Sequence, residues 1–391
     1  MVKKSSGAKP SRPPPPRAAT SGISGSAAGA GAGQGAAGTG KETAETPSAD
    51  EIRAQQRLLN VFNDTFRDVL TRDDFGAVLQ QVKGALYRRD FETAFSAEHF
   101  LEVYAARYSP PRALCYARVL AHVSGHLASV LDDAVASAGY GDEVERGRAS
   151  PTVDLEEETS AGAAALRMLA IGGGAAEVVA FGEHLRRIGS AVVGDLTLLD
   201  VGPWREVIRK LQLGLTTPPV LSKYASAAAK VANAALVEPA ERLRSTFVQQ
   251  DVLELDRGGL SKLLGPTPLL VTMLFTLNEL YTSGGVGKTT AFLRNLAVAI
   301  PAGSLLLVVD SPGSYSEAAV GKEAKKYPMQ WLLDHTLLQA DKLPSDGCTW
   351  EKLESHDSVW FRHPEGLRYS IELHDMRYQL HLYRACPRSS D

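Results

Sequence analysis

The sequence contains little cysteine. Its three cysteines, Cys115, Cys348 and Cys386, lie far apart, and no two of them form a CxxC pair. Disulfide frameworks and cysteine zinc sites both depend on cysteines at short, paired spacings. The sequence therefore argues against both kinds of site and favours a reducing compartment.

Long hydrophobic runs are also absent. No apolar run approaches the roughly 18 residues that a membrane-spanning helix needs. Met1 is followed by lysines, serines and prolines instead of the apolar core of a signal peptide. We therefore expect no membrane partner.

Neither sign of charge dominates. The formal net charge is −3 over 391 residues, so no overall basic field demands a nucleic acid. A local basic patch remains compatible with this balance. With 44% hydrophobic residues, the chain can build a substantial core, and its length suffices for two folded units.

Residues 1–48 are low in complexity, with a proline run followed by glycine, alanine and serine repeats. Such a segment cannot bury enough apolar area to offset its ordering entropy, so it predicts a disordered tail. Its basic residues all precede the first acidic one; they are Lys3, Lys4, Lys9, Arg12 and Arg17. They fit a nuclear signal or an RNA-contacting tail, and they equally fit a solvated linker.

Residues 49–138 predict a helical domain, because apolar residues recur three or four positions apart in several stretches. Pro110 and Pro111 break the chain before a further helix over 112–131. The polar, acidic residues 139–160 then predict a linker.

His122 and His126 lie one helical turn apart in the last of these stretches. Such a pair can bind a metal, but no third ligand is apparent in the sequence. We therefore expect packing or surface histidines, and no metal site.

A glycine-rich turn opens the second half of the chain. The apolar run 166–171 has the length of a strand, Gly172 to Gly174 follow at once, and 175–188 have helical periodicity. The pattern Gly172-x-Gly174-x-Ala176 is a relaxed form of a cofactor-binding turn. It would place backbone N–H groups and the positive end of a helix at the edge of a sheet.

A second strand, 196–199, ends at Asp200. A carboxylate there can accept hydrogen bonds from both hydroxyls of a ribose. The same carboxylate could instead cap the helix that begins near Trp204. The sequence leaves the two roles open.

Residues 161–388 continue as alternating strands and helices, which predict an α/β domain with an open seven-stranded sheet. Helices are expected between the strands, among them 227–244 and 289–300. The chain should close with two strands, within 358–364 and 376–385. The remaining polar strand ends are Asp251, Asn278 with Glu279, and Asp310. Ligands bind at such carboxyl ends in open α/β sheets.

The segment GGVGKTT resembles the phosphate loop of an ATPase. Gly287-Lys288-Thr289 is present, but the glycine expected five residues before Gly287 is Thr282. The segment also follows the fourth strand, whereas a phosphate loop belongs after the first. We expect a glycine loop that closes onto a helix, with Thr289 or Thr290 as the N-cap. A P-loop ATPase is the less favoured alternative.

Seven strands, a glycine turn after the first and an acid after the second resemble a class I S-adenosylmethionine-dependent methyltransferase, with its Rossmann-like sheet. Four later segments resemble the fungal 25S ribosomal RNA uridine-N3 methyltransferases: VVDSPGSYSE, KKYPMQWLLDHTLL, WEKLESHDSVWFR and IELHDMRYQLHLYR. The resemblance covers roughly residues 55–385. It implies methyl transfer from S-adenosylmethionine to N3 of a uridine in large-subunit ribosomal RNA.

The resemblance also implies roles for residues at the strand ends. Gly172, Gly174 and Glu177 would hold the methionine end of the cofactor. Asp200 would bind the ribose, and Asp251 would bind the adenine amine.

The target base would enter beside Asn278 and Asp310, which are the candidate catalytic residues. Asp310 could instead cap the turn that follows it. Tyr281 or Tyr315 could stack on the uracil, or could simply pack.

The expected partner is ribosomal RNA or the pre-ribosome, and the expected location is the nucleus and nucleolus, with the cytoplasm as an alternative. A non-catalytic methyltransferase-like protein that binds the cofactor or scaffolds ribosome assembly is the main alternative function. Binding of S-adenosylhomocysteine and of ATP, followed by an assay of methyl transfer, would separate these classes.

Overall fold

The computed structural model describes residues 47–134, 164–313, 315–320, 323–339, 343–344 and 346–388. Contacts divide the chain into 1–46 and one compact unit, 47–391. The tail expected to be disordered therefore lies, except for its last two residues, outside the described part. The expected linker 139–160 lies outside it as well.

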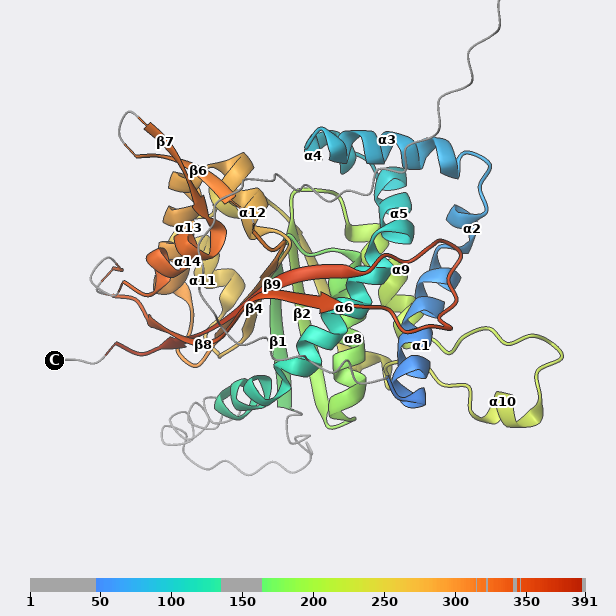
Figure 1. Cartoon of the computed structure of the whole chain (residues 1–391). Coiled ribbons are helices and arrows are strands. Elements are labelled where there is room, and N and C mark those ends of the chain that lie inside the picture. Colours follow the sequence, from blue (N-terminus) through green and yellow to red (C-terminus); the bar gives the residue numbers. More distant parts are fainter. Residues whose placement is uncertain are drawn as a thin grey trace, which may run out of the picture. The chain divides into compact units, whose positions relative to one another are not determined.

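The central feature is a seven-stranded sheet in the order β3-β2-β1-β4-β5-β9-β8 (Figure 1). Its strands are β1 (Ala164–Ile171), β2 (Val192–Asp200), β3 (Leu243–Gln249), β4 (Leu270–Leu274), β5 (Leu305–Asp310), β8 (Thr349–Phe361) and β9 (Met376–Cys386). The first five are parallel, and β9 runs antiparallel to both β5 and β8. The predicted α/β class, strand number and closing hairpin are confirmed. Because the strand order reverses beside β1, the switch point lies between β1 and β4.

Both faces of the sheet are covered, which explains why its central strands β4 and β5 are mostly apolar. All residues of β4 and β5 are buried. Leu305, Leu307 and Val309 belong to one core cluster. Leu306 and Val308 belong to the other. This division is the two-residue alternation of a strand buried on both sides.

The first core cluster contains α8 (Ala175–Ile188) and α9 (Arg205–Thr216). The second contains α11 (Arg257–Leu264), α13 (Val286–Ala299) and α14 (Met329–Leu337), which lie across the sheet in Figure 1. Helices pack on the sheet because its strands are parallel: each connection must carry the chain back to the same end of the sheet before the next strand begins.

The N-terminal helices pack on the same face as α8. They are α1 (Ala49–Thr65), α2 (Arg67–Leu70), α3 (Phe75–Tyr87), α4 (Phe91–Ala94), α5 (Glu98–Arg107) and α6 (Ser109–His122). Their apolar side chains share one core cluster with the sheet, and α6 packs directly against α8. The helical character of this region is confirmed, and the exact bounds 49–138 stay a prediction.

Pro110 and Pro111 begin a helix instead of separating two segments. Both lie in the first turn of α6. The first-turn N–H groups have no partner within a helix, so proline is tolerated there. The helix expected over 112–131 is divided by a turn at Val123, after which residues 124–134 are helical.

The helix expected over 227–244 does not form. Only α10 (Ala227–Val231) and the short 3₁₀ turn η1 (Ala240–Arg242) are helical there. Val231 is 89% exposed, so α10 has no apolar face against the protein. Pro239 also lacks the N–H that a continuous helix would need. Figure 1 shows this segment extending away from the sheet.

The segment after β4 is not a phosphate loop. The chain first forms α12 (Leu277–Glu279) and a π-helical turn, η3 (Leu280–Gly284). Gly285, with φ of 83°, is the N-cap of α13, so the expected cap at Thr289 or Thr290 is wrong. The Thr289 hydroxyl donates to the carbonyl of Gly285 at 3.0 Å. Lys288 pairs with Glu254 at 2.8 Å on the surface.

One hairpin was not expected from the sequence: β6 (Tyr315–Val320) pairs with β7 (Glu323–Pro328).

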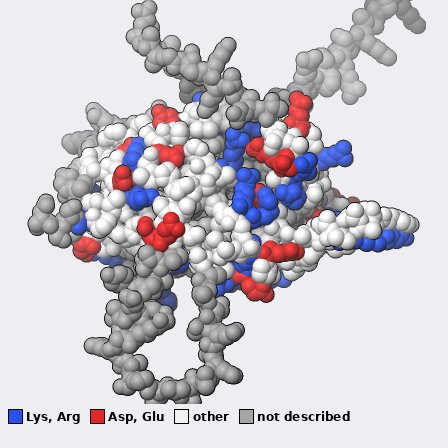
Figure 2. Space-filling view, turned by 90° about the horizontal axis from the view of Figure 1, so that it is seen from below, with Lys and Arg blue, Asp and Glu red and all other residues white. Residues whose placement is uncertain are grey.

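Among the described residues, no helix has the length and apolar character required to cross a membrane. On the face in Figure 2, Lys and Arg side chains gather with Asp and Glu among them. Positive charge there is mixed with negative charge, as the near-neutral composition suggests.

Candidate functional site

The glycine turn between β1 and α8 is tightly packed. Gly172 has φ of 68°, and a Cβ at this position would lie 2.3 Å from Oγ1 of Thr276. Its amide donates to the carbonyl of Leu199 at 2.8 Å. A Cβ at Gly174 would lie 3.2 Å from the ring of Trp204. Residues 172 and 174 therefore bring bare backbone against β2, β4 and the turn after β2.

A cavity of about 680 Å³ opens beside this turn, at the carboxyl ends of β1, β2, β3 and β4. Small-molecule sites in proteins usually lie in this size range. The five residues predicted to bind the cofactor all line it: Gly172, Gly174, Glu177, Asp200 and Asp251. The fold thus brings together positions that the sequence spreads over eighty residues.

Asp200 ends β2 at the centre of the cavity. Its Oδ1 accepts a hydrogen bond from the amide of Gly202 at 2.7 Å. Burial nevertheless raises the pKa of Asp200 to about 6. Asp251 lies farther along the rim, where its Oδ1 accepts from the amide of Leu253 at 2.9 Å. Asp200 therefore turns back on its own loop and does not cap α9, whose N-cap is Trp204.

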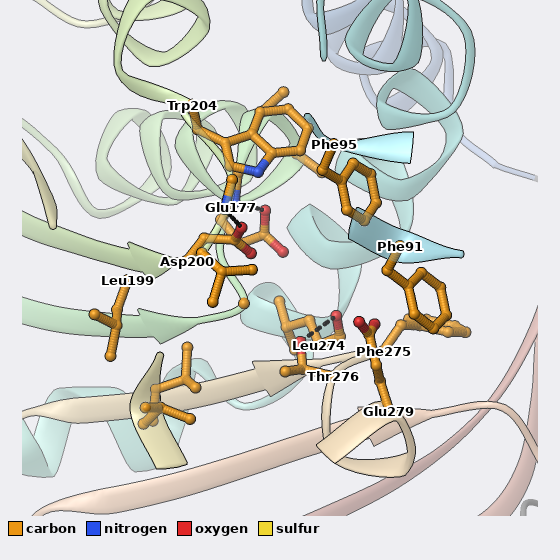
Figure 3. A pocket seen from close by; sticks show the side chains of 18 of the residues that line it. Phe91, Phe95, Glu177, Leu199, Asp200, Trp204, Leu274, Phe275, Thr276 and Glu279 are labelled. Carbon is orange, nitrogen blue, oxygen red and sulfur yellow. Dashed lines mark hydrogen bonds between the residues drawn. The ribbon is translucent and has the colours of Figure 1, made fainter. Parts of the chain in front are cut away.

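Glu177 and Glu279 add two further carboxyl groups. Burial raises the pKa of Glu177 to about 7, although a hydrogen bond of 2.8 Å from the amide of Gly174 lowers it. Burial raises the pKa of Glu279 to about 7 as well, and the negative charge of Asp200 adds to the effect. Figure 3 shows Glu177 and Asp200 below the indole of Trp204, and Glu279 on the side of Phe91 and Phe275. The cavity is therefore rich in carboxyl groups, and burial raises the pKa of three of them: Glu177, Asp200 and Glu279.

The N-terminal helices complete the cavity. Arg112 of α6 donates to the hydroxyl of Tyr104. Its guanidinium lies 5.5 Å from the ring centre of Tyr104 and 5.6 Å from that of Phe275. The positive charge of Arg112 lowers the pKa of Glu177 and Glu279, but burial outweighs this effect. Phe91 and Phe95 form the wall on the same side (Figure 3).

The predicted catalytic residues Asn278 and Asp310, and Tyr281, are not among the described residues that line this cavity. Asp310 is 3% exposed, and its carboxylate accepts from the amides of Asn278 at 2.9 Å and Ser311 at 2.7 Å. Tyr281 is 2% exposed and packs in the second core cluster. Tyr315 begins β6. Asp310 therefore holds the start of α12, the helix that carries Glu279.

Sequence reasoning missed Arg112, Tyr104, Phe95 and Trp204 as cavity residues. The helical region was treated as a separate domain, and nothing in its periodicity shows that α5 and α6 reach the sheet edge. Trp204 follows Asp200 by four residues, and this closeness to a predicted site residue was the one available signal.

Comparison with known proteins identifies a family. Residues 62–384 match the family described as "Putative SAM-dependent methyltransferase". The chain is 28% identical over 354 residues to the 25S rRNA (uridine(2843)-N(3))-methyltransferase of Saccharomyces cerevisiae, spanning 84% of this chain and 85% of that protein.

Two solved structures are similar to parts of the chain at low identity and low TM-score. A SAM-dependent methyltransferase from Methanosarcina mazei has 9% identity and a TM-score of 0.31, over 57% of this chain and 93% of its own. The N-methyltransferase NodS from Bradyrhizobium japonicum, in complex with S-adenosyl-l-homocysteine, has 12% identity and a TM-score of 0.29, over 56% of this chain and 78% of its own. The family match, and not these neighbours, carries the assignment.

Proposed function

The chain belongs to this family of S-adenosylmethionine-dependent methyltransferases, and we propose that it methylates N3 of a uridine in 25S ribosomal RNA. The observation that carries the proposal is the convergence of the glycine turn, Asp200 and Glu279 on one cavity at the switch point of the sheet. The yeast relative, whose name states this reaction, supports the choice of substrate.

The residues of the cavity suit the cofactor. S-Adenosylmethionine supplies a methyl group already activated on a sulfonium sulfur. Gly172 and Gly174 leave the backbone bare, so the cofactor can approach it closely. Any side chain at these positions would meet Thr276 or Trp204. In this proposal Asp200 would accept hydrogen bonds from the ribose hydroxyls, and Asp251 would accept one from the adenine amine. Burial raises the pKa values of Glu177 and Asp200, and a positively charged ligand beside them would stabilise their ionised forms.

A target uracil needs a stacking surface and a proton acceptor. Phe91, Phe95 and Phe275 offer aromatic faces at the side of the cavity opposite Asp200 (Figure 3). The imide N3 must lose its proton as it attacks. Glu279 is the proposed acceptor, because its carboxyl group lines the cavity and its pKa of about 7 suits a base at neutral pH.

Asp310 is the alternative acceptor. Its pKa is raised to about 6 by burial, but both of its oxygens already accept backbone hydrogen bonds. We therefore propose that Asp310 positions α12 and that Glu279 takes the proton. Stacking by Tyr281 or Tyr315 is not needed for this arrangement.

Ribosomal RNA or the pre-ribosome is the proposed partner, and the nucleus with its nucleolus is the proposed location. Both follow from the proposed substrate, because pre-ribosomal RNA is assembled there. Imaging of the full chain against a nucleolar marker would test the location, and a cytoplasmic signal alone would contradict it.

The function is tested with the full chain, unmodified 25S ribosomal RNA and S-adenosylmethionine carrying a labelled methyl group. Nuclease digestion and mass spectrometry should find N3-methyluridine. Asp200→Ala should lose cofactor affinity and product, whereas Asp195→Ala on the same strand, an exposed partner of Arg244, should not. Cofactor binding without transfer to any RNA would support the scaffold alternative instead, and magnesium-dependent ATP binding would support the ATPase.

A further inference from the structure

A second cluster of functional side chains lies outside the cavity, between the N-terminal helices and the edge strand β8. We call it the histidine cluster; its members are His122, His126, Glu354 and His356. Two come from the end of α6 and the helical residues that follow it, and two come from β8, more than 220 positions later.

Three imidazoles converge on one carboxylate in this cluster. Nε2 of His122 lies 2.7 Å from Oε2 of Glu354, and Nε2 of His126 lies 3.1 Å from Oε1. Nε2 of His356 lies 3.3 Å from Oε2 of the same residue. The donor atoms of His122, Glu354 and His356 all lie within 4.8 Å of one another. Imidazole nitrogens and carboxylate oxygens are both common metal ligands in proteins.

The backbone holds these side chains on facing surfaces. Glu354, Ser355 and His356 pair in uninterrupted register with β9, so residues 354 and 356 point to the same face of β8. His122 and His126 lie four residues apart, one helical turn, and their rings face that strand. The rings of His122 and His356 are 5.7 Å apart at a steep angle of 72°.

The geometry points to a binding site for one transition-metal dication of the zinc class at the histidine cluster. Three imidazole nitrogens and one carboxylate oxygen form a four-ligand set of the kind that zinc accepts. Metal–ligand bonds of about 2.0–2.1 Å place tetrahedral donor atoms about 3.4 Å apart. The donor atoms of His122, Glu354 and His356 already lie within 4.8 Å of one another. His126 contacts the same carboxylate and would turn toward the ion as the fourth ligand. Imidazole nitrogen also favours zinc, cobalt or nickel over magnesium and calcium.

The cluster is open enough for an ion to enter. The side chains of His122, His126 and His356 are 52%, 34% and 46% exposed, and that of Glu354 is 20% exposed. A bound ion would join α6 to the edge strand β8. Since α6 also carries Arg112, the ion would stabilise the helix that forms one wall of the cavity, without contacting the cavity itself.

Cobalt titration of the full chain, freed of any histidine tag and stripped with a chelator, tests the site. We expect one Co²⁺ per chain, an intense visible d–d spectrum typical of tetrahedral coordination, and displacement by Zn²⁺. Zn²⁺ should also raise the melting temperature, and a chelator should reverse the effect. His356→Ala and Glu354→Gln should each weaken Co²⁺ binding by more than about 100-fold. Loss of a residue that only hydrogen-bonds to a metal ligand costs about 10–100-fold, and loss of a ligand should cost more.

His99→Ala is the matched control, because His99 is an exposed histidine of α5 outside the cluster. It should bind cobalt like the wild-type chain. The proposal is overturned if the stripped wild-type chain shows no cobalt spectrum, or if His99→Ala weakens binding as much as His356→Ala does. In either case the histidine cluster is a set of hydrogen bonds only. Neither result depends on methyl transfer, so the test is separate from that of the proposed function.

Discussion

Replacing Glu279 by glutamine should separate the proton acceptor from the residues that only support it. Glutamine keeps the size of the side chain and removes its basicity. A positioned general base typically contributes 100- to 10,000-fold to a rate. We therefore expect Glu279→Gln to lower the single-turnover methylation rate at least about 100-fold, which corresponds to about 2.7 kcal/mol in activation free energy.

The pH profile carries the more specific expectation. The base must be ionised, and Glu279 has a pKa of about 7 in the free protein. In the wild-type chain, kcat/KM should therefore rise tenfold per pH unit below about 7 and then level off. Glu279→Gln should lack this plateau, because its rate then follows ionisation of the imide itself and keeps rising in alkaline solution.

Two comparison variants make the result interpretable. Asp310→Asn should lose less than Glu279→Gln and keep the plateau near pH 7, because Asp310 holds the amides of Asn278 and Ser311. Glu254→Gln removes an exposed carboxylate outside the cavity and should leave the rate unchanged. A rate for Glu279→Gln within tenfold of wild type would refute the assignment. A larger loss in Asp310→Asn would return Asp310 to the role of acceptor.

Three further results are expected. Asp200→Ala should weaken the binding of S-adenosylmethionine by about 1.5–3 kcal/mol in calorimetry. Gly174→Val should weaken this binding more, because the valine side chain would meet Trp204. Normal binding by both variants would show that the pocket is misplaced. Lys288→Ala should leave cofactor binding and methylation close to wild type, because its partner is a surface glutamate; loss of either, or loss of a magnesium-dependent ATP complex, would contradict this. Finally, the raised pKa values of Glu177, Asp200 and Glu279 mean that the folded chain binds more protons than the unfolded chain between about pH 4 and 7. Its free energy of unfolding should therefore fall as pH rises through this window. Glu279→Gln should raise the free energy of unfolding at pH 7.5 by on the order of 1 kcal/mol. Denaturant melts that show stability rising from pH 5 to 7 would exclude this assignment of the carboxyl groups.

Several strands of the sheet could be predicted from the sequence because they contain a short apolar run that a polar residue follows, whereas the first part of β8 is polar and was not predicted. β5 is the simplest case, since Leu305 to Val309 are apolar on both faces and Asp310 follows. The order along the chain then implies the parallel sheet, and the glycine turn marks the first crossover. Five cofactor positions could be placed for the same reason, because strand ends in a parallel sheet lie at one edge.

Positions beyond the strand ends could not be placed by counting. Asn278, Glu279 and Tyr281 are nearly consecutive, yet the short helix α12 and the π-helical turn η3 send their side chains in different directions. Glu279 lines the cavity, whereas Tyr281 is buried in the core on the other face. The segment 227–244 failed for a related reason. Its alanines favour a helix in isolation, but α10 buries none of its residues against the described part of the chain, and most helical stability in proteins comes from such packing.

The charged side chains of the cavity come both from the sheet and from the N-terminal helices. Burial raises the pKa values of Glu177, Asp200 and Glu279, and the negative charge of Asp200 adds to the effect at Glu177 and Glu279. Arg112 is the basic side chain that lines this cavity among the described residues, and it comes from α6. One positive charge cannot balance three carboxylates, so the free protein retains protons that a positively charged ligand would displace. The helical region is therefore part of the site, which the division of the sequence into a helical domain and a sheet domain could not show.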